Sequence, residues 1–197
     1  EIDAVLKDAP DDPDALVLRA GLHFDARRYD ESIADLRIAL RKQPEFQTAL
    51  LLLARVYAAA GDATLATDTY RRLLEVNPAR SEARAELALL LAERGDLTGA
   101  AEILEQQLKA MPGDLQTLAQ LAEVRLQMRE FAAAEAAARQ MIAAKDQRGL
   151  GEFQLARILQ AQKKYSEAER AFRAAIAQRP DDLLPLDGLV QTLVAAG

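Results

Sequence analysis

Residues 44–78 read PEFQTALLLLARVYAAAGDATLATDTYRRLLEVNP, and this stretch begins and ends with a proline. Its two prolines are 34 residues apart. The same spacing continues along the chain as a series that is broken once, by Asp146: Pro10, Pro44, Pro78, Pro112 and Pro180. Self-similarity at a fixed spacing of roughly 20 to 50 residues is typical of repeat proteins, so the chain is predicted to be an array of structural repeats.

Small and large apolar residues return at fixed positions of this period. If position 1 is the third residue after each proline, the units begin at Pro13, Gln47, Ser81, Leu115, Gly149 and Leu183. Position 7 is leucine in every unit after the first, where it is Arg19, and position 20 is always serine or alanine. Position 8 is alanine until the last unit, where it is Val190. A small residue lets two helices cross closely, and a larger one would overpack the crossing at about 1–3 kcal/mol. We therefore expect burial at the helix crossings for Ala54, Ala88, Ala122 and Ala156.

This pattern resembles the tetratricopeptide repeat (TPR), which has leucine at position 7, small residues at 8 and 20, and proline at 32. The resemblance covers the whole chain. It implies an all-α fold, a right-handed superhelical solenoid of antiparallel helix pairs of about 14 residues, with helix A and helix B in each unit. It also implies one array over residues 1–197. Its parts are a half-unit 1–12, whole units 13–46, 47–80, 81–114, 115–148 and 149–182, and a half-unit 183–197.

The two ends lack the polar capping helix with which solenoids usually finish. The last half-unit instead carries apolar residues, among them Leu186, Leu189, Val190 and Leu193. We therefore expect the array to be part of a longer protein, and the bias of the composition towards alanine, leucine and arginine favours a bacterial source. We also expect its end helices to promote self-association, because exposed apolar patches drive association.

The junction between the fourth and fifth units departs most from the pattern. Asp146 replaces the repeat proline, and Gly149 stands where a helix should start. Glycine has more conformational entropy to lose on folding than any other residue. The Lys145–Gly149 seam is therefore predicted to be locally less stable than the junctions at Pro44 and Pro78.

Turn and cap residues agree with the repeat. Gly61-Asp62 and Gly95-Asp96 are predicted to end helix A and reverse the chain, because glycine suits the left-handed conformation after a helix. Asp12 is predicted to cap the helix that starts with Pro13. Helix B is predicted to be capped at one shared repeat position, by Asp30, Thr64, Thr98 and Ser166.

Composition excludes several classes of function. The net charge of −6 and the pI near 5.0 argue against nucleic acid, which needs a basic face. No apolar run is long enough to insert into a membrane. There is no cysteine and one histidine, His23, which we interpret as a packing residue, so no cofactor or metal site is expected. Without a phosphate loop or nucleophile motif, the segment is predicted not to be an enzyme. The compartment stays open, since the lack of cysteine fits the cytoplasm and the periplasm.

The resemblance also implies where a partner would bind. In TPR proteins, ligands usually lie along the concave groove of successive helices A, at positions 2, 5, 6, 9, 12 and 13. Carried onto this sequence, the candidate partner-binding residues are Val17, Leu51, Arg55, Glu86, Leu89, Glu123, Phe153 and Arg157. The groove combines apolar residues with the acidic Glu82, Glu86, Glu93 and Glu123. This favours a protein or peptide segment with basic and apolar side chains, although the same charges also fit a solvated helix face.

The leading hypothesis is a non-catalytic scaffold that binds a partner segment in the groove and helps to assemble a bacterial cell-envelope or polysaccharide-export complex. One alternative is a structural array that self-associates through its end helices. Another is the recruiting arm of an enzyme whose catalytic domain lies outside this segment. The identity of the partner does not follow from the sequence.

Overall fold

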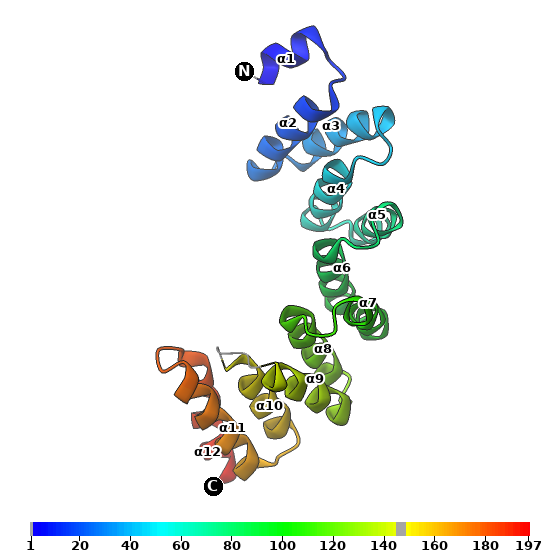
Figure 1. Ribbon diagram of the computed structural model, residues 1–197. Helices are drawn as coiled ribbons and strands as arrows, with labels where there is room; N and C mark the ends of the chain where they lie inside the picture. The colour runs from blue at the N-terminus through cyan, green and yellow to red at the C-terminus, as the bar shows by residue number, and fades with distance from the viewer. Residues whose placement is uncertain (1, 145–148) are drawn as a thin grey trace. The chain divides into compact units, whose positions relative to one another are not determined.

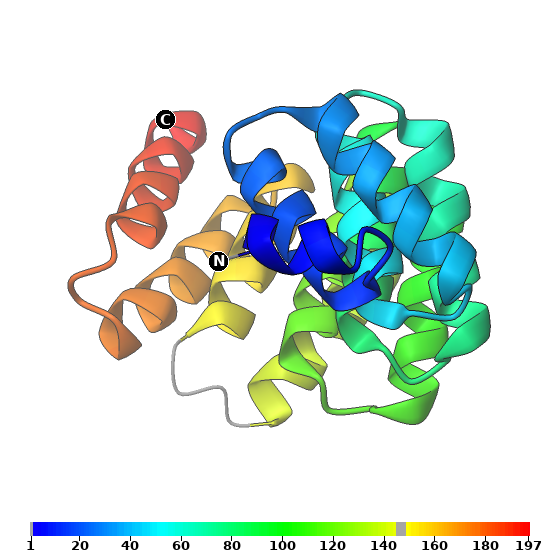
Figure 2. The same ribbon diagram turned by 90° about the horizontal axis from the view of Figure 1, so that it is seen from above.

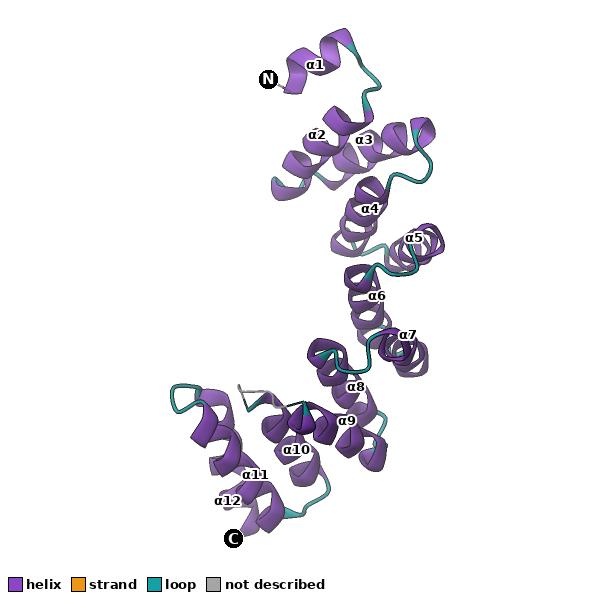
Figure 3. Cartoon of the chain, in the orientation of Figure 1, coloured by secondary structure: helices purple, strands orange, loops and turns teal. Residues whose placement is uncertain are grey.

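The computed structural model describes residues 2–144 and 149–197, and every regular element in that part of the chain is an α-helix (Figures 1 and 3). The twelve helices are α1 (Ile2–Asp8), α2 (Pro13–Asp25), α3 (Tyr29–Lys42), α4 (Gln47–Ala59), α5 (Ala63–Val76), α6 (Ser81–Glu93), α7 (Leu97–Ala110), α8 (Leu115–Gln127), α9 (Phe131–Ala143), α10 (Leu150–Ala161), α11 (Tyr165–Gln178) and α12 (Leu183–Ala196). None of the described helices is both long and apolar enough to span a bilayer.

Consecutive helices pack as antiparallel pairs joined by short turns. The helices A and B of a pair contact each other in α2 and α3, α4 and α5, α8 and α9, and α10 and α11. The last helix, α12, lies beside α11 in both views of the chain (Figures 1 and 2). The expected all-α fold of helix pairs is therefore confirmed.

The chain divides into two compact units. Unit 1 comprises Glu1–Leu91 and unit 2 comprises Ala92–Gly197, so the boundary falls within α6. Five helices A begin at the first residue of a predicted repeat: α2, α4, α6, α8 and α12. The sixth, α10, begins one residue later, after Gly149.

The small residues at position 8 lie in the core as expected. Ala54, Ala122 and Ala156 are fully buried, and Ala88 is 1% exposed. Apolar side chains from neighbouring helices surround them. In unit 2, for example, Ala156 shares a cluster with Phe172 and Leu189, from α11 and α12. These contacts bring the helix backbones close together, which explains why the position is small.

The turns between helices A and B use one left-handed residue at a fixed repeat position. Gly61 and Gly95 have φ angles of 86° and 84°, as expected for glycine in this conformation. At the same position of the other turns stand three non-glycine residues with φ from 57° to 62°: Arg27, Arg129 and Lys163. The geometry of the turn is therefore kept even where the residue is less suited to it.

The predicted caps are right for one helix and wrong for others. The Asp12 carboxylate accepts the Ala15 amide at 2.8 Å, which confirms it as the cap of α2. The four residues predicted to cap helix B lie inside their helices instead: Asp30, Thr64, Thr98 and Ser166. The caps stand two residues earlier. Asp62, for example, accepts the Leu65 amide at 3.2 Å, because the residue directly after the left-handed turn residue is the cap and helix B starts at the next one.

Replacing Lys163 with glycine should raise the free energy of unfolding by up to about 1 kcal/mol. A side chain in the left-handed region stores strain that glycine does not have. The reciprocal change Gly95→Lys should lower stability by a similar amount, because Gly95 occupies the equivalent position. Urea unfolding followed by circular dichroism measures both. A loss of stability in Lys163→Gly would show that the lysine side chain stabilises the protein by more than the strain of its left-handed backbone destabilises it.

Gly149 combines a left-handed backbone with a tight space, both of which favour glycine. Its φ is 64°, and a Cβ atom at this residue would lie 3.0 Å from the Ala175 carbonyl oxygen of α11. The glycine therefore permits a close approach of α11 to the start of α10. The rest of the predicted weak seam, residues 145–148, lies outside the described residues, and its low stability stays a prediction for hydrogen exchange.

Candidate functional site

In unit 1, the candidate groove residues of α4 and α6 form a network of ion pairs. Arg55 of α4 donates to both Glu82 and Glu86 of α6, with closest N–O distances of 2.5 Å. The hydroxyl of Tyr70, on α5, donates to Glu86 at 2.7 Å. Arg55 and Glu86 belong to successive repeats, so the network joins two helices A across a repeat boundary.

The titration behaviour of these groups follows from the network. The hydrogen bond from Arg55 is the main reason that the pKa of Glu82 is lowered. Burial, reinforced by the bond to Glu86, raises the pKa of Tyr70 well above its usual value. The two carboxylates in turn raise the pKa of Arg55. All three groups therefore keep the ordinary charge states of neutral pH, as a structural network requires, and none is poised for proton transfer.

Unit 2 contains a second bridge between successive helices A. Arg157 of α10 donates to Glu123 of α8 at 2.5 Å. Its guanidinium also lies 5.9 Å from the ring centroid of Phe153. Burial would raise the pKa of Glu123, but hydrogen bonds from Arg157 and Gln127 outweigh it, and the pKa is lowered.

The stability of unit 2 should therefore fall in acid partly through Glu123. A carboxyl group with a lowered pKa contributes stability that is present above its ordinary pKa of 4.5 and lost as the pH falls through the folded-state value. The wild type should exceed Glu123→Gln in stability by its largest margin at neutral pH. This difference should shrink as the pH falls below about 4.5. Urea titrations at several pH values measure it. Glu102→Gln, at an exposed position, is the control. The same pH dependence in this variant would contradict the role of Glu123.

The structure divides the eight predicted groove residues by exposure. Val17 and Leu51 are buried, so their side chains contribute little surface for a partner. Leu89 is 55% exposed. Phe153 packs against the core, with its ring centroid 6.1 Å from that of Phe172. The remaining four are the half-buried members of the two ion-pair networks, Arg55, Glu86, Glu123 and Arg157.

One hollow of unit 2 brings groove positions together with residues that the sequence did not single out. This α8–α10 hollow has a volume of about 470 Å³ and is lined by Leu126, Arg129, Phe131, Arg157, Gln160 and Ala161. Four of the six stand at positions 9, 12 or 13 of the repeat, among them the predicted Arg157. The hollow therefore opens on the side of the molecule that the repeat pattern assigns to ligands.

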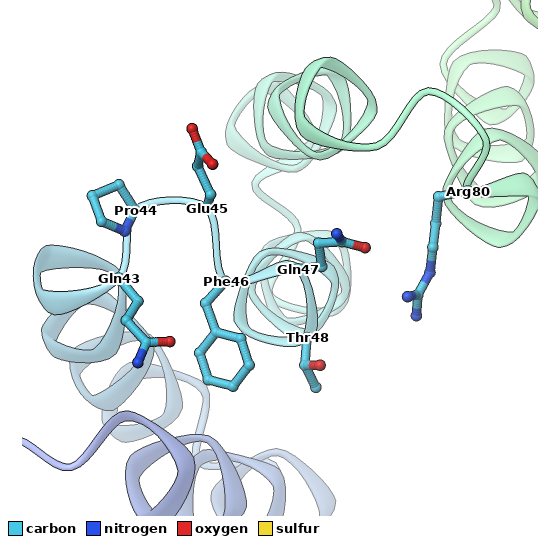
Figure 4. Close-up of a pocket in the computed structure, with 7 residues that line it drawn as sticks. All are labelled: Gln43, Pro44, Glu45, Phe46, Gln47, Thr48 and Arg80. Carbon is cyan, nitrogen blue, oxygen red and sulfur yellow. The ribbon is translucent and has the colours of Figure 1, made fainter.

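A larger hollow of unit 1, of about 650 Å³, lies where α3 passes into α4 (Figure 4). Gln43, Phe46 and Thr48 line it, and Arg80 reaches it from the segment before α6. Two of its polar side chains bind residues outside the lining. Arg80 pairs with Glu82 at 3.1 Å, and the Gln47 amide oxygen accepts from Asn77 at 2.9 Å. Only Thr48 of its lining stands at a groove position.

Sequence comparison identifies the family to which these helix pairs belong. A family model described as tetratricopeptide repeat matches residues 1–45, 18–75 and 51–114, and a second with the same description matches residues 153–186. The chain belongs to the tetratricopeptide repeat family. No curated protein sequence matches the chain.

Several solved structures share this TPR fold at low sequence identity. YrrB, a TPR protein with an unusual peptide-binding site, is 14% identical with a TM-score of 0.72, over 94% of this chain and 96% of its own. MamA is 16% identical with a TM-score of 0.74, over 85% of this chain and 92% of its own. PilW, a type IV pilus biogenesis factor, is 19% identical with a TM-score of 0.69, over 93% of this chain and 87% of its own. The TPR fold supports a general role as a protein interaction scaffold.

The described part of this TPR chain contains no cluster of side chains suited to binding a metal ion. No three residues of His, Cys, Asp and Glu gather there as they would to hold a metal ion. His23 lies within unit 1, with its Nε2 atom 3.7 Å from Asp35, which Arg19 holds through two hydrogen bonds of 2.7 Å. TPR proteins are generally non-catalytic scaffolds, and this arrangement is one of packing and charge pairing.

Proposed function

We propose that this TPR array is a scaffold that binds a partner segment on its helix-A face, meaning the exposed sides of α2, α4 and residues 81–91 of α6 in unit 1, and separately those of α8 and α10 in unit 2. The observation that carries the proposal is the α8–α10 hollow, in which Leu126, Arg157, Gln160 and Ala161 meet at groove positions. A concave site with apolar walls and a few polar groups is the usual form of a binding site.

The charge pairs modify the expected partner chemistry. Three glutamates that would attract a basic segment, Glu82, Glu86 and Glu123, are already paired with Arg55 or Arg157. The helix-A face instead offers exposed apolar side chains, such as Leu18 and Leu89. We therefore propose a segment whose apolar side chains supply the affinity, with basic residues adding a smaller electrostatic attraction.

Assembly of a multi-protein complex is the biological role that we propose for this binding. The complex that we propose is a bacterial cell-envelope or polysaccharide-export complex, and the fold shared with PilW, a type IV pilus biogenesis factor, supports the cell-envelope part of this proposal. In such a role, the array holds one component through its helix-A face while other surfaces stay available.

The test uses the whole chain to probe an array of immobilised peptides of varied composition. Ala161→Glu places a charge at the exposed rim of the α8–α10 hollow, and Ala133→Glu places the same charge at an exposed position of α9 outside its lining. Peptides that bind the wild type should bind Ala161→Glu at least about tenfold more weakly, because a charge added to an apolar contact must be desolvated. An equal loss in Ala133→Glu, or no bound peptide at all, would be evidence against the helix-A face.

Phe153→Ala is not a suitable test of binding. Because Phe153 packs against the buried cluster around Phe172, its truncation should lower stability whether or not a partner binds.

Self-association is a second candidate function, favoured by the apolar surface of α12. Leu186, Val190 and Leu193 stand at positions 4, 8 and 11 and are 46%, 51% and 44% exposed, whereas the alanines at position 8 in the preceding helices A are buried. Light scattering at increasing concentration should show association in the wild type that is lost in Val190→Glu. A wild-type chain that stays monomeric throughout would remove this candidate.

A further inference from the structure

A second hollow of unit 1 lies on the opposite set of helices. It is lined by α3 and α5, with α4 beneath them, and we call it the α3–α5 hollow. Its volume is about 490 Å³, and its lining residues are Arg37, Leu40, Arg41, Leu53, Tyr57, Leu65, Asp68, Thr69 and Arg72. None of them is a groove position of helix A, so the helix-A face does not account for this hollow.

The floor of the α3–α5 hollow is apolar and well packed. Leu53 and Tyr57 of α4 and Leu40 of α3 are buried, whereas Leu65 of α5 is 38% exposed. Leu65 thus offers apolar surface to a visiting side chain, while the buried residues fix the shape of the floor. An apolar floor with a polar rim is the arrangement of a protein-binding patch.

Three arginines of the hollow form no ion pair with a carboxylate of the described residues. Arg37 donates to the Tyr57 hydroxyl at 2.9 Å, and Arg72 donates to the Pro44 carbonyl oxygen at 2.5 Å, so both meet neutral acceptors. Within residues 2–144 and 149–197, no carboxylate forms an ion pair with Arg37, Arg41 or Arg72. Arg55, on the helix-A face of the same unit, has two such partners.

These hydrogen bonds also position the guanidinium groups. The Arg37 guanidinium lies 5.9 Å from the Tyr57 ring centroid, and its two bonds to the hydroxyl fix its orientation over the floor. An arginine that is already oriented loses less side-chain entropy when it binds a carboxylate. Asp68 is the one acidic residue of the lining, so the three arginines leave the hollow with a positive balance in a chain whose net charge is −6.

We infer that the α3–α5 hollow is a second docking surface, which binds an acidic protein segment carrying one apolar side chain. The apolar side chain would lie against Leu65, and carboxylates on either side of it would pair with Arg37, Arg41 and Arg72. Charge-assisted bonds between arginine and carboxylate provide both affinity and orientation. A nucleic acid fits less well, because its backbone offers no apolar group for the floor and would meet Asp68 and the overall negative charge.

The test measures binding of a fluorescein-labelled peptide with three glutamates around one leucine, by fluorescence anisotropy. A matched peptide with glutamines in place of the glutamates shows how much of the affinity depends on charge. The whole chain is compared with the triple variant Arg37→Gln/Arg41→Gln/Arg72→Gln, in which all three replaced residues are exposed. The matched control is Arg71→Gln/Arg94→Gln/Arg170→Gln, which removes the same charge from exposed positions outside the hollow.

The wild type and the control variant should bind the acidic peptide alike, and the hollow variant at least about tenfold more weakly. Binding should weaken as salt is added, be lost with the glutamine peptide, and be unchanged in Ala161→Glu, which alters the helix-A face. Circular dichroism should show the same melting for all variants. Equal losses in the two triple variants would mean unspecific attraction and overturn the inference. It would also be overturned by a double-stranded DNA that binds the hollow as tightly as the peptide, or by no binding of the acidic peptide.

Discussion

Phe172→Ala should lower the free energy of unfolding of unit 2 by about 3–5 kcal/mol, the largest effect that we expect from a single change. Phe172 is fully buried and contacts residues of α10, α11 and α12. Its removal leaves a cavity that the helices can fill only in part, so both transfer energy and packing are lost. Urea unfolding followed by circular dichroism measures the loss, and Arg173→Ala, at an exposed position of the same helix, is the control.

Gly188 of α12 provides a double-mutant test of the same contact. A Cβ atom at Gly188 would lie 2.4 Å from Cε1 of the Phe172 ring, so Gly188→Leu alone should also be destabilising. In the Phe172→Ala background, however, the leucine can point into the vacated space. The double variant should therefore be more stable than the sum of the two single losses predicts. Additive losses would show that α12 does not dock against Phe172 as described.

Asp35→Ala should lower the free energy of unfolding by about 2–3 kcal/mol, because it removes a buried carboxylate together with its two hydrogen bonds to a half-buried arginine. Asp35 is 5% exposed and accepts two hydrogen bonds of 2.7 Å from Arg19. The change leaves the His23 side chain without its nearest carboxylate as well. Equilibrium unfolding in urea measures the loss.

The pair can also be removed without leaving a charge behind. Arg19 stands at position 7, which is leucine in the following repeats, and Asp35 stands at position 23, which is Ala137 in the fourth unit. The double variant Arg19→Leu/Asp35→Ala should therefore recover most of the stability lost in Asp35→Ala, since apolar replacement of a buried pair is often neutral. If the double variant is as unstable as the single one, the pair makes a net contribution to stability and does more than offset the cost of burying its two charges.

Much of the fold could be predicted because steric requirements recur with the repeat. Alanine at position 8 reports a close helix crossing, and glycine at Gly61 and Gly95 reports a left-handed turn. Both are local requirements that favour one residue type, although arginine or lysine takes the glycine position in three of the turns. The starts of helix B were predicted two residues too late, because aspartate, serine and threonine are also common in the first turn of a helix, and only Asp62 and Asp96 stand at a true cap.

The candidate site was predicted less well, because the exposure and pairing of a long side chain depend on its neighbours in space. Position 5 residues such as Val17 and Leu51 were expected to face a partner but are buried. The bridges from Arg55 to Glu86 and from Arg157 to Glu123 join residues 31 and 34 positions apart. The sequence does contain opposite charges at groove positions of consecutive repeats. That these charges pair can be recognised only once the helices are placed side by side.

The pattern of helix contacts has a consequence for how the chain acquires its structure. In the described part of the chain, the helix pairs that pack most closely are neighbours or next-but-one neighbours in sequence, as with α2 and α3 or α8 and α10. Closing short loops costs little entropy, so such chains fold fast and can do so from several starting points. During synthesis, each hairpin can therefore form soon after its second helix leaves the ribosome, without waiting for the rest of the chain.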